Sequence, residues 1–267
     1  MGSEMCIRDR YCYLQEYQNF AGIILPTNID EFLHRISSQI RASNKVFRIG
    51  TGEFTDSLAL DHISGFSKNL IKFFSERKNV LFEFKTKTSN IDNLLNEKSS
   101  DNIVIAWSIN PQNVVDKNEI YSASLRQRIQ SAAKCQQARY PLAFHFDPII
   151  YYSGWEKDYS RTIEMLFSEI KPEKVKWISL GTLRFKRDLK TVIENRFPQN
   201  NILDEEMILG FDGKLRYPDF IRIEIYRKMI KLLGKCGINK KKIYLCMESS
   251  EIWRKSQIIP IFTWQDS

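Results

Sequence analysis

Apolar runs and amphipathic stretches alternate along the chain from residue 11 onward. Short runs of Val, Ile and Phe bounded by turn residues predict buried strands, and apolar residues at every third or fourth position predict helices. We expect strands near residues 45–54, 80–87, 102–110, 140–150, 175–185 and 241–249. We expect helices over residues 29–40, 61–76, 90–98, 124–138, 155–170 and 220–237.

This alternation predicts an α/β fold with a parallel sheet wound by helices. A closed or partial (β/α) barrel and an open doubly wound sheet both satisfy the pattern. The 267 residues are enough for a single barrel domain, which we place over residues 11–267. Residues 184–220 form a polar and basic excursion between the last two strands. Inserts of this kind on barrels often carry the specific function.

The composition narrows the class of protein. Forty Lys and Arg residues against 32 Asp and Glu give a net charge of +8, which suits either an ordinary basic protein or one with a polyanionic partner such as DNA. Five scattered cysteines do not form a disulfide framework, so we expect a reducing, cytoplasmic location. The sequence contains no apolar run of about 18 residues, so we expect no membrane partner.

The first ten residues, MGSEMCIRDR, show no periodicity and join abruptly to a coherent segment, YCYLQ. We interpret residues 1–10 as a non-native leader, and a disordered natural N-terminus is the alternative. They lack the apolar stretch of a signal peptide.

Polar side chains follow most of the expected strands. In a barrel the carboxyl ends of the strands meet at one rim and carry the active residues. The candidates at these ends are Glu53, Lys87, Ser108, His145, Asp147, Arg184, Cys246 and Glu248.

Each of these candidates also has a structural interpretation. The glycines of Gly50-Thr51-Gly52-Glu53 allow close approach to a ligand, but a tight turn uses glycines equally well. His145 could be a satisfied core histidine, and Asp147 could cap the segment before Pro148. No cysteine and histidine cluster has zinc spacing, and no Gly-x-Ser-x-Gly elbow occurs.

Several short motifs occur together in one order: YCYLQ, GTGEFTDSLALDH, FKTK, SIN, YPLAFHFDPI and GWEKDY. In this order they resemble the spore photoproduct lyase family of radical S-adenosylmethionine enzymes, over roughly residues 11–250. The resemblance implies a partial (β/α) barrel of the radical S-adenosylmethionine type, with its first strand missing from this chain.

The family holds a 4Fe–4S cluster with a Cys-x3-Cys-x2-Cys-Tyr loop, and the cluster binds S-adenosylmethionine. By this resemblance Cys12 is the third ligand of the cluster. The second and first ligands fall at Asp9 and Met5, and Cys6 is out of register by one residue. One thiolate cannot hold three irons, so we expect this truncated chain to bind a cluster poorly and to be inactive.

The resemblance also assigns roles to other residues. It implies that S-adenosylmethionine is bound by Gly50, Gly52, Glu53, Thr55, Lys87 and Ser108. Tyr11 and Tyr13 take the place of tyrosines that relay the radical. Arg216 and Tyr217 match a pair on a hairpin that wedges into DNA, and Arg184 matches an arginine near the lesion.

One position departs from the family pattern. Glu53 stands where the family has a cysteine that donates hydrogen to the product radical. Cys246 could substitute if it faces the same cavity, and a buried structural thiol is the alternative.

The leading hypothesis is therefore a radical lyase that repairs a DNA photoproduct by hydrogen abstraction from the lesion, supplied with electrons by a flavodoxin or ferredoxin. A lesion in a duplex must leave the base stack, and phosphates could meet the lysines of the insert, unless these are only a solvated face. Two alternatives stay open: a radical enzyme with another substrate, and a non-catalytic barrel that binds nucleic acid.

Overall fold

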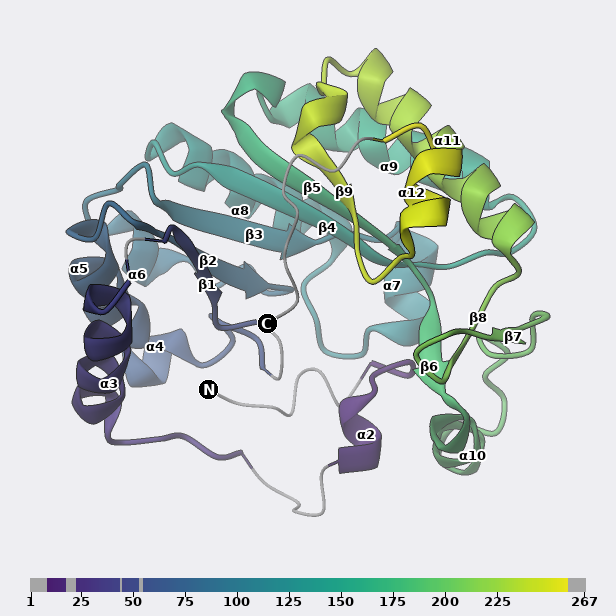
Figure 1. Ribbon diagram of the computed structural model, residues 1–267, viewed down its shortest axis with the longest axis horizontal. Helices are drawn as coiled ribbons and strands as arrows, with labels where there is room; N and C mark the ends of the chain where they lie inside the picture. Colours follow the sequence, from purple (N-terminus) through teal and green to yellow (C-terminus); the bar gives the residue numbers. More distant parts are fainter. Residues whose placement is uncertain (1–8, 18–22, 44, 53–54, 259–267) are drawn as a thin grey trace.

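The computed structural model describes residues 9–17, 23–43, 45–52 and 55–258. Six parallel strands form one sheet in the order β1-β2-β3-β4-β5-β9. They are β1 (Phe47–Gly50), β2 (Val80–Thr86), β3 (Ile103–Ser108), β4 (Leu142–Ile149), β5 (Val175–Thr182) and β9 (Ile243–Leu245). The sheet curls into part of a barrel (Figure 1). All six expected strands are therefore confirmed, and the partial barrel is the correct alternative.

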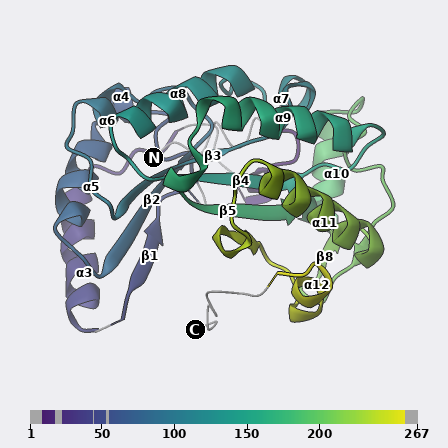
Figure 2. The same cartoon turned by 90° about the horizontal axis from the view of Figure 1, so that it is seen from above.

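The helices lie on the outer face of the curled sheet, where α8 and α9 lie along one side of it (Figure 2). The helices of the main barrel are α3 (Ile29–Arg41), α4 (Asp61–Ser64), α5 (Phe66–Ser75), α6 (Asp92–Leu95), α7 (Gln112–Asn118), α8 (Leu125–Gln137), α9 (Trp155–Glu169), α11 (Asp219–Lys235) and α12 (Ser250–Lys255). A doubly wound sheet would carry helices on both faces. Here the inner face stays available for a site.

Local chemistry explains these elements. All residues of β3, Ile-Val-Ile-Ala-Trp-Ser, are buried, because helices cover the outer face of this central strand and side chains of other strands cover its inner face. Helix α8 begins with a capping box in which Ser124 and Gln127 satisfy each other's backbone N–H groups. The expected single helix over residues 61–76 is wrong in one respect. Gly65 has a φ of 60°, which ends α4 and starts α5 separately.

The basic excursion has its own structure. It contains β6 (Arg184–Lys186), α10 (Arg187–Arg196), β7 (Ile208–Leu209) and β8 (Lys214–Arg216), and its strands form a second, antiparallel sheet in the order β6-β8-β7. The short helix α2 (Leu14–Tyr17) packs against α10, where Arg196 donates to Gln15 at 2.8 Å. The excursion thus lies beside the segment that carries Cys12 (Figure 1).

The two faces of the sheet differ in chemistry. The large apolar core lies between the outer face and the helices. The inner face holds only a small apolar cluster of Val104, Ala106, Ala143 and Trp177. No helix in the described ranges is long and apolar enough to cross a bilayer.

Candidate functional site

A cavity of about 790 Å³ opens on the inner face of the sheet, toward the carboxyl ends of the strands. Alternate residues of a strand point to the same face, so each strand contributes every second side chain. The lining includes Arg48, Gly50, Gly52, Glu83, Lys85, Lys87, Ser108, His145, Asp147, Arg184, Tyr244 and Cys246. Tyr11, Cys12, Tyr13, Thr55 and Lys186 close the cavity from other segments. Of the polar strand ends that the sequence predicts, Lys87, Ser108, His145, Asp147, Arg184 and Cys246 line this cavity, whereas Glu248 is not among its lining residues.

Glu83 organises one wall of the cavity. Its carboxylate bonds His145 Nε2 at 2.6 Å and Arg48 Nη2 at 2.8 Å. Burial opposes ionisation of Glu83, but His145 and Arg48 outweigh burial and lower its pKa to about 2. Burial also lowers the pKa of His145 against the opposing effect of Glu83. We therefore assign a neutral His145 that donates a hydrogen bond to an ionised Glu83.

Aromatic side chains fix the position of Arg48. Its guanidinium lies 4.0 Å from the centre of the Trp177 ring, and it also donates to Tyr244 OH at 3.2 Å. Stacking on a ring and bonding a carboxylate hold a planar guanidinium in one orientation. This wall of the cavity is consequently rigid and already ordered.

Asp147 and Arg184 form a second polar group near the mouth of the cavity. Arg184 donates to both carboxylate oxygens, at 2.9 and 3.1 Å, and its Nη2 lies 3.4 Å from Cys246 Sγ. Burial opposes ionisation of Asp147, but Arg184 outweighs burial and lowers its pKa to about 2. Burial and the neighbouring Asp147 raise the pKa of Cys246 to about 12. Cys246 therefore keeps its proton as a thiol.

Lys87 lies in a buried charge cluster rather than free in the cavity. Its Nζ contacts Asp9 Oδ2 at 2.5 Å and Glu119 Oε1 at 3.1 Å, and Arg128 also contacts Glu119 at 2.5 Å. Tyr11 OH donates to Glu119 and accepts from Lys87 at 2.9 Å. Burial raises the pKa of Asp9 to about 7. Arg128 and Lys87 hold the pKa of Glu119 low, although its burial opposes this.

The segment around Cys12 bears on cluster binding. Cys12 is buried, and Asp9 points to Lys87. Within the described ranges, no group of three or more His, Cys, Asp or Glu residues is placed to hold a metal ion. The described residues therefore do not fit a 4Fe–4S cluster. Met5 and Cys6 lie outside the described residues.

The other cofactor candidates sit around the same cavity. Gly50, Gly52, Thr55 and Ser108 all line it, and Tyr13 is 38% exposed beside Tyr17. Glu53 lies outside the described residues. Gly52 lies close against β2, because a Cβ atom added there would come within 2.5 Å of Lys85 Cβ. Its lack of a side chain makes room for Lys85.

Arg216 and Tyr217, the pair that the resemblance predicts to insert into DNA, do not project from the hairpin. Tyr217 is fully buried, where its hydroxyl accepts from the backbone N–H of Tyr151 at 3.1 Å. Arg216 is buried as well, so neither residue is presented to a partner in this arrangement. The most exposed apolar side chains of the hairpin are instead Leu209 and Phe211, which are 60% and 78% exposed.

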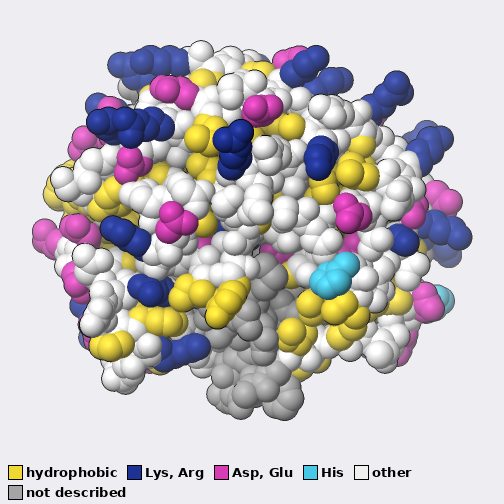
Figure 3. Space-filling model, turned by 180° about the vertical axis from the view of Figure 1, so that it is seen from behind, with side chains coloured by type: hydrophobic (Ala, Val, Ile, Leu, Met, Phe, Trp, Pro, Cys, Tyr) yellow, Lys and Arg dark blue, Asp and Glu magenta, His cyan; other side chains and the backbone are white. Residues whose placement is uncertain are grey.

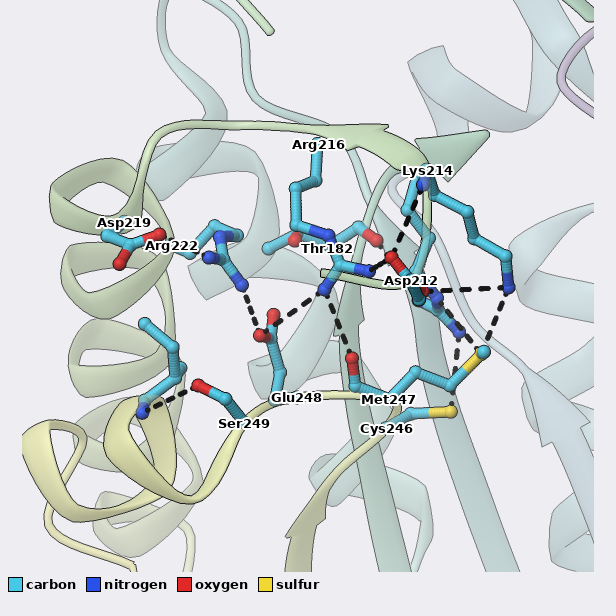
Figure 4. Close-up of polar contacts among 12 residues, drawn as sticks. Thr182, Asp212, Lys214, Arg216, Asp219, Arg222, Cys246, Met247, Glu248 and Ser249 are labelled. Atoms are coloured by element: carbon cyan, nitrogen blue, oxygen red, sulfur yellow. Dashed lines mark hydrogen bonds and ion pairs between the residues drawn. The ribbon is translucent and has the colours of Figure 1, made fainter. Parts of the chain in front are cut away.

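Arg216 connects the β7–β8 hairpin to the end of β9 through buried hydrogen bonds and ion pairs (Figure 4). It donates to Asp212 Oδ1 at 2.5 Å and to the carbonyl of Met247 at 3.2 Å. Glu248 lies beside it, 3.7 Å from Arg216 Nη1, and also bonds Arg222. The hairpin is thereby joined to the segment that carries Cys246.

The charged residues of this region that sequence reasoning missed include Arg48, Glu83, Lys85, Glu119 and Arg128. Glu83 and Lys85 leave a signal, because they interrupt an apolar strand at alternate positions and so share one face. Glu119 leaves none, because it follows a short helix and meets Lys87 only in the folded chain.

The fold and the cavity at the strand ends define a radical S-adenosylmethionine half barrel. A family model described as spore photoproduct lyase matches residues 3–222, so the chain belongs to the spore photoproduct lyase family. The chain is 30% identical to spore photoproduct lyase of Bacillus subtilis (strain 168) over 202 residues, which are 73% of this chain and 59% of that protein. It is 25% identical to that of Clostridium acetobutylicum over 214 residues, 79% of this chain and 63% of that protein.

The chain thus spans about three fifths of the length of the curated relatives that it matches. Solved structures agree on the fold. A spore photoproduct lyase mutant with bound S-adenosylmethionine and dinucleoside spore photoproduct superposes with a TM-score of 0.80 at 23% identity, over 89% of this chain and 72% of that chain. A cysteine-to-alanine mutant with the dinucleoside gives 0.80 at 25% identity, over the same shares.

Proposed function

We propose that this chain is the barrel of a radical S-adenosylmethionine lyase that acts on a DNA photoproduct. One observation carries the proposal: the polar cavity opens toward the strand ends of a half barrel that superposes, with a TM-score of 0.80, on a lyase holding S-adenosylmethionine and the dinucleoside lesion. Membership of the family supports the same activity. The activity concerns the whole protein, whose cofactors would be a 4Fe–4S cluster and S-adenosylmethionine and whose reductant would be a flavodoxin or ferredoxin.

The lining of the cavity suits S-adenosylmethionine, which supplies the hydrogen-abstracting radical in this chemistry. Gly50 leaves the backbone open to a ligand, and Thr55 and Ser108 offer hydroxyl groups at the lining. Lys87 is the least accessible of the proposed contacts, because Asp9 and Glu119 already hold its ammonium group. We therefore assign the described residues binding and orienting roles.

Cys246 is the residue that we propose as the hydrogen donor to the product. Its side chain lines the cavity, as it must if Cys246 is to replace the hydrogen-donating cysteine of the family. A hydrogen-atom donor must be a thiol rather than a thiolate, and burial beside Asp147 keeps this sulfur protonated. Tyr11 and Tyr13 line the same cavity, so they remain the candidates for the relay.

We propose that DNA meets the mouth of the cavity beside the β7–β8 hairpin. Lys186 and Lys214 line this side of the cavity, and their carboxylate partners are 3.8 and 3.9 Å away, so both can turn to phosphates. Phe211 at the hairpin turn is better placed than Tyr217 to stack on a base, because it is 78% exposed. On the face opposite to Figure 1, the basic and acidic side chains of the described residues are interspersed rather than gathered into one basic patch (Figure 3).

Calorimetric titration of the purified chain with S-adenosylmethionine and with dinucleoside spore photoproduct tests the proposal. We expect both to bind, and a variant that fills the cavity, Ser108→Trp, to bind neither. A chain that binds neither molecule would contradict the proposal.

A non-catalytic barrel that binds nucleic acid is the second candidate. One observation favours it: the described residues offer no set of metal ligands. Binding of DNA without binding of S-adenosylmethionine would identify this alternative. Iron content and the visible absorbance after anaerobic reconstitution with iron and sulfide provide an independent readout.

A further inference from the structure

Lys85 holds an unusual place among the charged residues of the cavity. Six cations line it, namely Arg48, Lys85, Lys87, Arg184, Lys186 and Lys214, together with five carboxylates, namely Asp9, Glu16, Asp56, Glu83 and Asp147. A cation whose charge is already matched by a carboxylate has little left for a ligand. The pairing of these groups therefore shows which one is available.

The other cations of the cavity all have carboxylate partners. Arg48 pairs with Glu83 at 2.8 Å, Lys87 with Asp9 at 2.5 Å, and Arg184 with Asp147 at 2.9 Å. Toward the rim, Lys186 lies 3.8 Å from Glu16, and Lys214 lies 3.9 Å from Asp212.

The remaining carboxylate, Asp56, is satisfied without a cation. It accepts from the backbone N–H groups of Leu58, Ala59 and Lys87 at 2.7–2.9 Å and from the hydroxyl of Thr86 at 2.6 Å. Lys85 is thus left as the cavity cation whose ammonium group makes no ion pair or hydrogen bond with any residue that the structure describes.

The backbone directs Lys85 into the cavity. It lies on the same face of β2 as Glu83, and Gly52 covers its Cβ so closely that no side chain fits at residue 52. Lys85 lines the cavity together with His145, Asp147 and Cys246, residues of both polar walls.

We propose that Lys85 is the anchor for an oxyanion of the molecule that fills this cavity, an inference that rests on the proposed function. An ammonium group with no carboxylate partner can form a charge-assisted hydrogen bond with a phosphate or carboxylate oxygen. Enclosure of the ligand strengthens this bond, because water no longer screens it. Lys87, which the resemblance assigns to the cofactor, is less suited to this role, because Asp9 and Glu119 already contact its ammonium group.

Two molecules of the proposed reaction carry a suitable oxyanion. One is the carboxylate of S-adenosylmethionine, and the other is the phosphodiester that links the two nucleosides of a lesion. Each has a natural control that lacks the oxyanion: decarboxylated S-adenosylmethionine and the dinucleoside without its phosphate.

The experiment compares the wild-type chain with Lys85→Met, which keeps the length of the side chain and removes its charge. Lys85→Arg restores the charge, and Lys176→Gln removes an exposed lysine of β5 outside the cavity. Calorimetric titration measures the affinity of each variant for the four ligands and for inorganic phosphate, and circular dichroism confirms the fold.

We expect Lys85→Met to weaken one oxyanion-bearing ligand by about 10- to 100-fold and to leave its oxyanion-free control unchanged. The ligand that responds identifies the source of the oxyanion. Lys85→Arg should recover most of the affinity, and Lys176→Gln should resemble wild type. Equal affinities of wild type and Lys85→Met for every ligand would overturn the anchor while leaving the proposed function intact. If the wild-type chain binds neither S-adenosylmethionine nor the lesion, the proposed function fails. In that case the phosphate titration tests the anchor by itself: loss of phosphate binding in Lys85→Met supports the anchor, and unchanged binding overturns it.

Discussion

Arg184 and Asp147 form a two-point ion pair, with contacts of 2.9 and 3.1 Å, directly beside the thiol of Cys246. The two residues come from β6 and β4, so the pair joins the antiparallel excursion to the barrel. A planar guanidinium held at two points has little freedom to rotate. The pair therefore fixes both the position and the electrostatic surroundings of the sulfur.

The first prediction concerns the acidity of this thiol. In Asp147→Asn the carboxylate that raises the pKa of Cys246 is gone, and Arg184 is left to stabilise the thiolate. We expect the pKa of Cys246 to fall below its value of about 12, so that alkylation by iodoacetamide at this residue becomes faster at neutral pH. Peptide mass spectrometry against pH measures the effect. Asp101→Asn, at an exposed loop position, is the matched control, and an unchanged profile in Asp147→Asn would refute the assignment.

The second prediction concerns stability in acid. The pKa values of Glu83 and Asp147 are about 2 in the folded chain, below their ordinary values of 4.5 and 3.8. Their contribution is complete above the unfolded pKa values and is lost as the pH falls from about 4.5 to about 2. We expect Glu83 to contribute about 3 kcal/mol and Asp147 about 2 kcal/mol to the free energy of unfolding at neutral pH.

Urea unfolding at a series of pH values measures this contribution. Glu83→Gln should flatten the stability curve between pH 4.5 and 2. Glu97→Gln, in a partly exposed turn outside the cavity, should leave the curve as in wild type. A slope as steep as that of wild type in both Glu83→Gln and Asp147→Asn would contradict the prediction.

The third prediction compares the loss of stability when a side chain is added at Gly50 and at Gly52, the two glycines at the end of β1. A Cβ at residue 52 would lie 2.5 Å from Lys85 Cβ, whereas a Cβ at residue 50 would meet Glu83 atoms only at 3.6–3.8 Å. We expect Gly52→Ala to lower the free energy of unfolding by about 1–3 kcal/mol, and Gly50→Ala to cost less. Denaturant unfolding of the two variants measures these costs. Equal losses in the free energy of unfolding would contradict the prediction and would show that β2 shifts at Lys85 to make room for the added methyl group.

The fourth prediction concerns the buried ion pairs of Glu248. This buried carboxylate accepts from Tyr226 OH at 2.7 Å, bonds Arg222 and lies 3.7 Å from Arg216. Glu248→Gln removes one of the two carboxylates that each buried arginine contacts, while Asp212 still pairs with Arg216 and Asp219 with Arg222. We expect a loss of about 2 kcal/mol in the free energy of unfolding. Glu251→Gln, whose side chain is 55% exposed on α12, is the control and should cost less than 1 kcal/mol.

The fifth prediction tests the proposal that Phe211 stacks on a base of the DNA. Phe211→Ala should weaken binding of a lesion-containing duplex by about 5- to 100-fold, because one aromatic stacking contact is lost, while stability stays unchanged. Phe220→Ala removes an aromatic residue of similar exposure, 70% against 78%, from α11. Fluorescence anisotropy measures both affinities. Equal effects of the two substitutions would remove Phe211 from the interface.

Local pattern was sufficient for much of the fold. The six strands, their alternation with helices and the polar residues at their ends follow from periodicity and turn residues, which are local properties of the chain. The short motifs also led to the family, because their order along the chain is itself sequence information. By contrast, the elements of the excursion, such as β7 with two residues, are too short to show a period.

Tertiary structure alone decided which charges are matched. Lys85 and Lys87 are two residues apart and look equivalent in the sequence, yet only Lys87 meets Asp9 and Glu119, which lie 78 and 32 positions away. Arg216 and Tyr217 likewise become internal because β8 packs against the end of β9. Ion pairing and burial depend on distances between segments remote in the chain, and packing sets these distances, so local periodicity carries no record of them.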